Sequence, residues 1–308
     1  SFSNINSKQV KKMFVDFDKI IFRLSFRDAP LANFILNLFF QWDIWTLGKI
    51  KKFSEKWKTD LELILNKIEY LDSILPFSNF HFHQKDTQFP TIDPSLKNIQ
   101  ATSLGHPLIP KKQRVNNPLE KVNFSSVVLI TGSNMSGKTT YLRSIGVNTL
   151  LALCGSPVVA ENFTLPPIQI LSSIKNEDSL DEGISFFYSE VRKIAYILKT
   201  AKSNDIPSLI LIDEVLKGTN TRERIIATEK ILRELSKPAY RSINFITTHD
   251  LELAKGPKAK KWKMKHFVEL IEDGKMSFDY KIRDGVVNSS NALRILSLEY
   301  PEIVFVDI

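Results

Sequence analysis

One segment constrains this chain more than any other. Residues 132–139 read G-S-N-M-S-G-K-T and fit the pattern G-x-x-x-x-G-K-S/T. Glycines in such a loop let the backbone curl so that successive N–H groups point at phosphate oxygens. The β-branched run at residues 127–131 predicts a strand before the loop, and the residues up to Leu153 predict a helix after it. Because a chance match is a poor explanation in that setting, we expect a phosphate-binding loop followed by a helix with its positive end toward the anion.

An acidic pair adds a second element. The apolar run at residues 209–212 predicts a strand, and it ends in Asp213-Glu214. Alone, such a pair is as readily the start of a helix, but beside a phosphate loop it favours catalysis. We expect Lys138 to reach the β- and γ-phosphates, and the Thr139 hydroxyl and Asp213 to hold Mg²⁺. Glu214 would position or deprotonate the attacking water, which favours hydrolysis over phosphoryl transfer by a small-molecule kinase.

A third apolar run, residues 244–248, ends in Thr248-His249-Asp250. In open parallel sheets, ligands lie beyond the carboxyl ends of the strands. His249 is therefore predicted as a catalytic residue that senses the γ-phosphate or the water. A helix-capping or hydrogen-bonded structural histidine is the alternative.

From residue 126 onward, strand patterns alternate with helical ones. The helical patterns consist of apolar residues at three- and four-residue steps: Phe187, Val191, Ile194 and Leu198, and then Ile225, Leu232 and Leu235. Strands that alternate with helices imply a mainly parallel sheet covered on both faces. The sequence therefore predicts an α/β fold, preceded by a short helical segment.

The helical segment spans residues 1–77. Its two apolar stripes are Leu31, Ile35, Leu38, Trp42 and Trp45, and then Leu61, Ile64, Ile68, Leu71 and Leu75. Such stripes are more often packed core than a cofactor site, and we expect Pro76 to end the second helix. Prolines and scattered polar residues mark residues 78–100 as a connector. His81 and His83 could bind a metal from one face of a strand, but without nearby carboxylates or cysteines we expect surface histidines.

Charge and composition exclude several classes of protein. The 308 residues carry 42 basic and 34 acidic side chains, a net charge of +8 that is compatible with a nucleic acid or nucleotide partner. Lysines at 255, 258, 260, 261, 263 and 265 are expected to form a solvated loop, with a DNA contact as the alternative. The single cysteine, Cys154, fits a reducing compartment, and no segment is long and apolar enough for a membrane span. We expect a cytoplasmic protein, and a fragment of a longer chain.

Residues 131–140, T-G-S-N-M-S-G-K-T-T, resemble the T-G-P-N-M-G-G-K-S-T loop of the MutS family of DNA mismatch-repair ATPases. The N-M pair in that loop is much more specific than the general pattern. Other motifs of the family follow in order across residues 101–285. The matching segments are Gly105-His106-Pro107 (R-H-P), Val115-Asn116-Asn117 (V-P-N), Ser185-Phe186-Phe187-Tyr188-Ser189-Glu190 (S-T-F-x-x-E), Asp213-Glu214 with Lys217-Gly218-Thr219-Asn220-Thr221 (D-E-x-x-x-G-T-S-T) and Thr248-His249 (T-H).

The resemblance implies a P-loop NTPase fold for residues 101–308, an ATPase domain similar to that of ABC transporters, in which two copies sandwich two nucleotides. It implies ATP and Mg²⁺ as ligands, a homodimer through the ATPase domain, and DNA bound through regions largely missing from this chain. Residues 1–77 resemble a remnant of the core and lever region. The nucleotide-binding residues would be Gly132, Ser133, Asn134, Met135, Ser136, Gly137, Lys138, Thr139 and Thr140, with Asn117 near the adenine and Ser185 reaching the γ-phosphate of the partner subunit.

Departures from the family pattern indicate a divergent subfamily. Ser133 and Ser136 replace a proline and a glycine of the loop, and Gly105 stands in place of an arginine. Arg222-Glu223-Arg224 stands where Asp-Gly is usual. The predicted function is ATP hydrolysis at a composite dimer site, coupled to DNA binding in repair. The alternatives are a nucleotide-gated DNA-binding or scaffold protein with slow or vestigial hydrolysis, and an ABC-type ATPase of another family, which the missing L-S-G-G-Q glycines disfavour.

Overall fold

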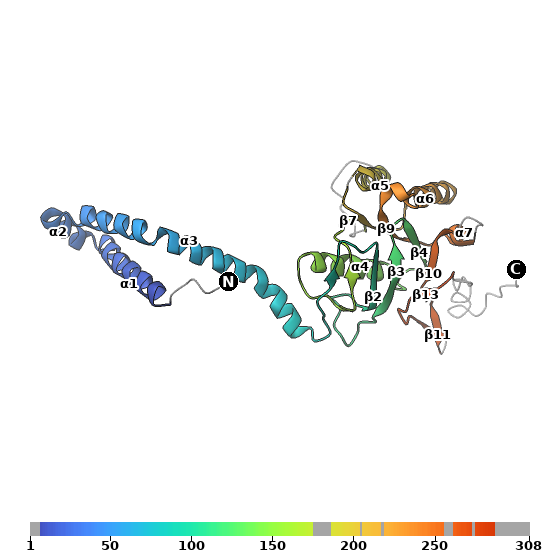
Figure 1. The fold of residues 1–308 in the computed structure, drawn as a ribbon, viewed down its shortest axis with the longest axis horizontal. Coiled ribbons are helices and arrows are strands. Elements are labelled where there is room, and N and C mark those ends of the chain that lie inside the picture. The colour runs from blue at the N-terminus through green and yellow to red at the C-terminus, as the bar shows by residue number, and fades with distance from the viewer. Residues whose placement is uncertain are drawn as a thin grey trace. The chain divides into compact units, whose positions relative to one another are not determined.

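Helices make up the N-terminal part of the chain, and strands alternate with helices in the rest (Figure 1). The computed structural model describes residues 7–174, 186–203, 205–216, 219–255, 261–272 and 275–286. Internal contacts divide the chain into two units, Ser1–Ser78 and Asn79–Ile308. No helix within these described ranges is both long and apolar enough to cross a membrane.

The first unit is built from helices alone. They are α1 (Ser7–Leu24), the 3-10 turn η2 (Ser25–Asp28), α2 (Pro30–Phe40) and α3 (Trp42–His83). Gln41, between α2 and α3, has a left-handed backbone with φ of 48°. That conformation ends α2, so the first predicted stripe is divided between two helices.

α1 packs along α3. The Asp16 carboxylate accepts hydrogen bonds from Lys56 Nζ at 3.2 Å and from Trp57 Nε1 at 3.3 Å. Met13 and Ile20 of α1 are buried, as is Trp57 of α3. The contact therefore uses one narrow face of each helix.

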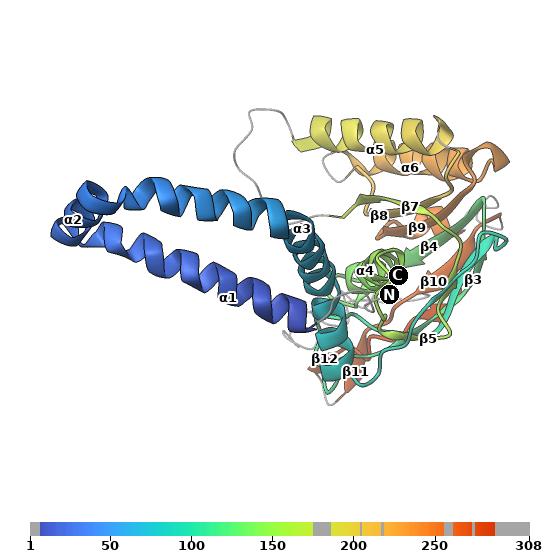
Figure 2. The same cartoon turned by 60° about the vertical axis from the view of Figure 1, so that its left-hand side comes forward.

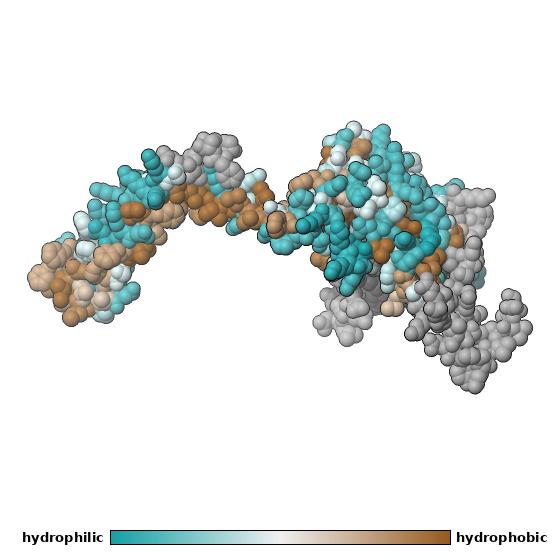
Figure 3. All heavy atoms as spheres, turned by 90° about the horizontal axis from the view of Figure 1, so that it is seen from below, coloured by the Kyte–Doolittle hydropathy of each residue, from teal (hydrophilic) through white to brown (hydrophobic). Residues whose placement is uncertain are grey.

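Most residues of the two apolar stripes lie outside that contact. All except Trp42 and Ile64 are exposed, and Leu31 is 76% exposed and Leu38 63%. The expectation that these stripes form a packed core was wrong for the described part of the chain, because α1 covers only one face of α3 and α2 contains no buried residue. Figure 3 shows hydrophobic side chains gathered along one side of this helical unit.

The expectation that Pro76 ends the second helix was also wrong. Pro76 lies inside α3, which continues to His83. A proline removes one backbone donor without removing the hydrogen bonds of the later turns. His81 and His83 consequently lie on a helix rather than a strand. Their Nδ1 atoms form hydrogen bonds with Thr87 Oγ1 and the Asn79 carbonyl oxygen, and no group of three metal-binding side chains occurs in the described ranges.

A six-stranded sheet forms the centre of the second unit, in the order β13-β10-β4-β9-β8-β7. Its strands are β4 (Ser126–Thr131), β7 (Gln169–Ser173), β8 (Ser208–Asp213), β9 (Ser242–Thr248), β10 (Lys263–His266) and β13 (Arg283–Asp284). All neighbours are parallel except β10 and β13. The predicted mainly parallel α/β arrangement is confirmed, and β4, β8 and β9 end side by side, since Thr131 pairs with Thr248 and Asp213 with Thr247.

Both faces of this sheet are covered (Figure 2). Helix α4 (Lys138–Leu153) covers one face, and α5 (Phe186–Ser203) and α6 (Thr221–Leu235) cover the other. Alternate residues of β4 follow this division, because Val128 and Ile130 belong to the α4 core and Val127 and Leu129 to the α5–α6 core. The period-two alternation explains why these strands are apolar at nearly every position.

Smaller elements complete the unit. A second sheet has the order β1-β6-β2-β3, with β5 paired to β2. Its strands are β1 (Thr91–Ile92), β2 (Asn98–Leu104), β3 (Asn117–Asn123), β5 (Ala160–Glu161) and β6 (Thr164–Leu165). The remaining elements are η3 (Pro238–Tyr240), α7 (Leu251–Lys255) and a pair of antiparallel strands, β11 (Leu270–Glu272) and β12 (Lys275–Ser277).

The lysine run is not one solvated loop, as the sequence had led us to expect. Lys263 and Lys265 lie in β10, where the Lys265 ammonium is paired with Glu120 and Asp284, both at 2.6 Å. Burial opposes the charge of Lys265, but the hydrogen bonds to Asp284 and Glu120 outweigh it and raise its pKa. Lys265 is therefore buried and paired with two carboxylates rather than solvated.

Candidate functional site

The loop between β4 and α4 has the backbone that its glycines were expected to provide. Gly132 and Gly137 have φ of 143° and 109°, a region that side chains rarely adopt. A Cβ on Gly132 would lie 2.8 Å from the Phe267 carbonyl oxygen. Gly137 is the residue that precedes α4, so the loop leads directly to the N-terminal end of that helix.

Lys138 is 4% exposed and folds back over this loop. Its Nζ donates to the carbonyl oxygens of Gly132 at 2.8 Å and Ser133 at 2.6 Å, and lies 3.4 Å from His249 Nε2. The loop residues differ in exposure: Asn134 and Met135 are exposed, whereas Ser136 is buried and donates to the Ser133 carbonyl oxygen. Ser133 Oγ is buried and has no hydrogen-bond partner among the described residues. A buried hydroxyl without a partner is costly, and an anion in the loop would supply one.

Asp213 and Thr139 meet beside the loop. Thr139 Oγ1 donates to Asp213 Oδ2 at 2.8 Å, and Thr247 Oγ1 donates to Asp213 Oδ1 at 2.6 Å. The strand register explains the meeting, since Asp213 ends β8 opposite Thr247 of β9. A hydroxyl and a carboxylate are oxygen ligands of the kind that Mg²⁺ prefers, and Mg²⁺ commonly takes only one or two carboxylates besides phosphate and water.

Glu214 and His249 form a pair at the same edge. Glu214 Oε1 lies 2.6 Å from His249 Nε2, and the Glu214 N–H donates to Thr247 Oγ1 at 3.0 Å. Glu214 has a left-handed backbone with φ of 57°, which turns its side chain away from the line of β8. The structure thus brings together four residues that three separate sequence segments contributed: Lys138, Asp213, Glu214 and His249.

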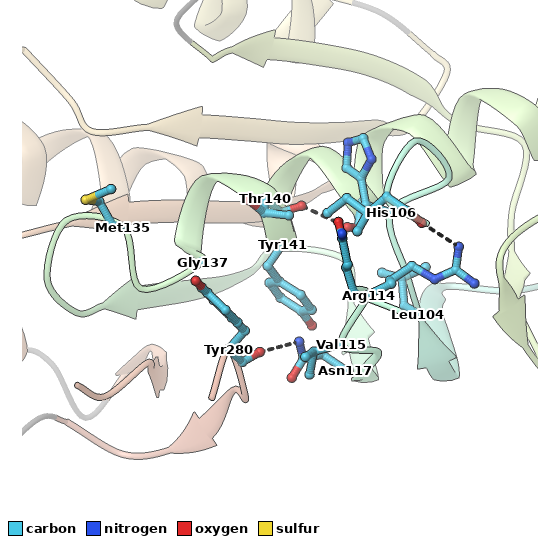
Figure 4. A pocket seen from close by; sticks show the side chains of 13 residues that line it. Leu104, His106, Arg114, Val115, Asn117, Met135, Gly137, Thr140, Tyr141 and Tyr280 are labelled. Atoms are coloured by element: carbon cyan, nitrogen blue, oxygen red, sulfur yellow. Dashed lines mark hydrogen bonds between the residues drawn. The ribbon is translucent and has the colours of Figure 1, made fainter. Parts of the chain in front are cut away.

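A pocket of about 550 Å³ opens next to the loop (Figure 4). It is lined by Leu104, His106, Ile109, Gln113, Arg114, Val115, Asn117, Met135, Gly137, Thr140, Tyr141, Ser144 and Tyr280. Its walls favour uncharged groups. Burial, with the charges of Arg143 and Arg114, lowers the pKa of His106, and burial, with the charge of Glu120, raises the pKa of Tyr141. We refer to it as the loop pocket.

Asn117 lines the loop pocket, but its side chain binds protein backbone. Its Nδ2 donates to the Tyr280 carbonyl oxygen at 2.9 Å, and its Oδ1 accepts from the Ile282 N–H at 2.8 Å. These bonds hold Tyr280, whose ring would lie 3.4 Å from a Cβ on Gly137. No sequence motif indicated Tyr280, because it lies in an irregular segment far from the other site residues along the chain.

Arg114 explains the departure at Gly105. The Arg114 side chain is 1% exposed, and its guanidinium is paired with Asp86 and donates to the Ile109 carbonyl oxygen at 3.2 Å. A Cβ on Gly105 would lie 2.7 Å from Arg114 Cδ and 2.3 Å from Asn116 Oδ1. The arginine that the family carries at this position has no room here, since Arg114 fills the space.

The structure describes only part of the predicted motif around Ser185. Ser185 lies outside the described residues, as do Lys217 and Gly218. Glu190, from the same motif as Ser185, is buried, and its Oε1 accepts from the Leu216 N–H at 3.1 Å. This bond ties α5 to the segment that follows Glu214.

Comparison with known proteins gives the following matches. Residues 128–306 match a sequence model described as MutS domain V. Endonuclease MutS2 of Thermotoga neapolitana is 30% identical over 245 residues, which are 77% of this chain and 30% of that protein. MutS protein homolog 4 of Mus musculus is 35% identical over 192 residues, 60% of this chain and 19% of that protein. The chain therefore spans less than a third of the length of either relative.

Proposed function

Since the chain belongs to the MutS family, we propose that its second unit is a P-loop ATPase domain of the ABC type that binds ATP with Mg²⁺ and hydrolyses it. One observation carries the proposal: Lys138, Thr139, Asp213, Glu214 and His249 converge at one edge of a parallel sheet. Three of the distances are 2.8 Å for Thr139–Asp213, 2.6 Å for Glu214–His249 and 3.4 Å for Lys138–His249. Ligands of such sheets lie at this edge.

The loop would hold the phosphates. Its backbone N–H groups and the N-terminal end of α4 supply positive potential. The Lys138 ammonium and the Ser133 hydroxyl would donate hydrogen bonds to phosphate oxygens. To do so, Lys138 exchanges the carbonyl oxygens of Gly132 and Ser133 for phosphate oxygens. Thr139 and Asp213 would hold Mg²⁺, which when bound neutralises charge that develops on the phosphate oxygens.

Glu214 is the proposed general base. Its carboxylate would orient the attacking water and accept its proton, and His249, 2.6 Å from Glu214 Oε1, would keep that carboxylate in place. The loop pocket would hold the base of the nucleotide, because it adjoins the loop, is lined mainly by uncharged side chains and presents the Tyr280 ring for stacking. Asn117 then acts by holding Tyr280.

The wider role follows the family. We infer that two copies of the domain form a composite site in which Ser185 serves the partner subunit, and that nucleotide state is coupled to DNA binding in a repair-related role. The relative from Thermotoga neapolitana is named an endonuclease, whereas the proposed role of the residues at this sheet edge is ATP chemistry.

The test is phosphate release from MgATP by the whole chain and by Glu214→Gln. The amide keeps the size of the side chain and removes the base, so release should fall by about 100-fold or more while ATP binding persists. Glu229→Gln on α6, which removes a carboxylate paired with Arg233, is the matched control and should release phosphate like the unmodified chain. Equal rates in all three proteins would refute Glu214 as the base, and ATP binding without release by the unmodified chain would support the nucleotide-gated scaffold.

A further inference from the structure

Arg224 and Asp250 form a two-pronged ion pair next to the proposed site. Arg224 Nε donates to Asp250 Oδ2 and Arg224 Nη2 to Asp250 Oδ1, both at 2.7 Å. The side chains are 24% and 10% exposed. A planar guanidinium that meets both oxygens of a sheltered carboxylate is fixed in direction as well as distance.

The pair joins two segments that each carry a proposed catalytic residue. Arg224 lies in the first turn of α6, which begins soon after Glu214. Asp250 directly follows His249, and its N–H donates to Thr248 Oγ1 at 3.0 Å. The Asp250 carbonyl oxygen also accepts from Leu253, at the start of α7. Asp250 is therefore held from both sides along the chain, and Arg224 fixes its side chain.

An ion pair that only closes a helix end would not need these features. Exposed pairs of that kind contribute little, as in Arg233 with Glu229 at the other end of α6. Arg224 differs because it makes two charge-assisted bonds, and the hydrogen bond to Asp250 raises its pKa. It also lies in the segment where this chain departs from its family, which usually has Asp-Gly there.

We propose that Arg224 is a positioning residue that acts through Asp250 to hold His249 against Glu214. The inference rests on the proposed ATP hydrolysis, and it assigns a role to a residue that the family pattern lacks. Arg224 binds Asp250 and is not among the residues proposed to hold the phosphates or Mg²⁺. Its loss should therefore lower kcat and leave the KM for ATP nearly unchanged.

The kinetic test compares Arg224→Gln, Arg224→Lys and the control Arg233→Gln. Because a displaced catalytic group costs up to about 100-fold in rate, we expect kcat of Arg224→Gln to fall by about 10-fold or more. Arg224→Lys keeps the charge but can form only one of the two bonds to Asp250. Its kcat should therefore lie between those of Arg224→Gln and the unmodified chain. Asp250→Asn combined with Arg224→Gln should lose no more than Arg224→Gln alone, since the two residues act as one unit. Full activity of Arg224→Gln, or additive losses in the double variant, would overturn the proposal.

A second readout needs no hydrolysis. In chain labelled with ¹³C-histidine, the five imidazoles give separate ring signals, and His249→Gln identifies that of His249. Arg224→Gln should shift or broaden this signal without nucleotide, whereas Arg233→Gln should not. If the position and width of the His249 signal are unchanged in a folded Arg224→Gln protein, the positioning role is wrong, even if hydrolysis is intact. A moved signal in a chain that hydrolyses no ATP would leave the placement of His249 standing and remove the proposed function instead.

Discussion

Asn117, the first residue of β3, holds the backbone on both sides of Lys281, through Tyr280 and Ile282. Both ends of its amide are used, one as donor to Tyr280 and one as acceptor from Ile282. The residue is 7% exposed. A ligand can therefore meet the Tyr280 ring that Asn117 positions more readily than the Asn117 amide itself.

Asn117→Ala should weaken ATP binding through Tyr280. Two hydrogen bonds to a buried amide disappear, each worth about 1 kcal/mol net, and Tyr280 loses its anchor. We expect the Kd for MgATP to rise about tenfold, equivalent to about 1.4 kcal/mol. Equilibrium binding of a fluorescent ATP analogue measures it. Asn123→Ala, at the exposed end of the same strand, is the control, and equal affinities of the two variants would contradict the anchoring role.

At this scale the sequence predicted which residues lie near one another better than it predicted their individual contacts. Motifs at the ends of predicted strands indicated Lys138, Asp213 and Glu214 as a group, because the carboxyl ends of neighbouring parallel strands lie at the same edge of a sheet. The same reasoning could not find Tyr280, which has no periodic pattern around it. Nor could it show that Arg114 fills the space above Gly105, since that contact depends on the path of an irregular loop.

Among the elements, the residues that directly follow α3 are tied to the segment that borders the loop pocket. Gln84 Nε2 donates to the Pro107 carbonyl oxygen at 3.2 Å, and Arg114 reaches back to Gln84 Oε1 at 3.5 Å and pairs with Asp86. All of these residues belong to the second unit. The connection therefore runs from a pocket wall to the C-terminal end of α3 through one guanidinium.

Arg114→Met should destabilise the second unit. Methionine keeps most of the volume but strands the Asp86 carboxylate, and removing one partner of a buried pair costs about 3 kcal/mol. Urea unfolding followed by circular dichroism measures the change. Adding Asp86→Met removes the stranded charge and should recover much of the loss. If the double variant is less stable than Arg114→Met, the ion pair is not the source of the effect.

The elements show where sequence patterns succeed and fail. The helix after the loop ends at Leu153 as its pattern predicted, and the strands at β4, β8 and β9 match their apolar runs within a few residues. Strands such as β1, β5 and β6 span two residues each and carry no detectable alternation. α3 continues through Pro76 because the hydrogen bonds of the neighbouring turns outweigh the one that proline removes.

For the whole molecule, the proposed composite site makes assembly depend on nucleotide. In that site, the γ-phosphate contact assigned to Ser185 would come from the partner subunit. Light scattering of Glu214→Gln should therefore show a shift from monomer to dimer when ATP and Mg²⁺ are added, because bound ATP persists in this variant and contributes surface to the interface. Lys138→Ala should stay monomeric under the same conditions. It lacks the ammonium that donates to loop carbonyl oxygens and would donate to phosphate oxygens when ATP binds. A Glu214→Gln chain that binds ATP and remains monomeric would separate nucleotide binding from dimerisation, and the role of Ser185 in the partner's site would then be wrong for this chain.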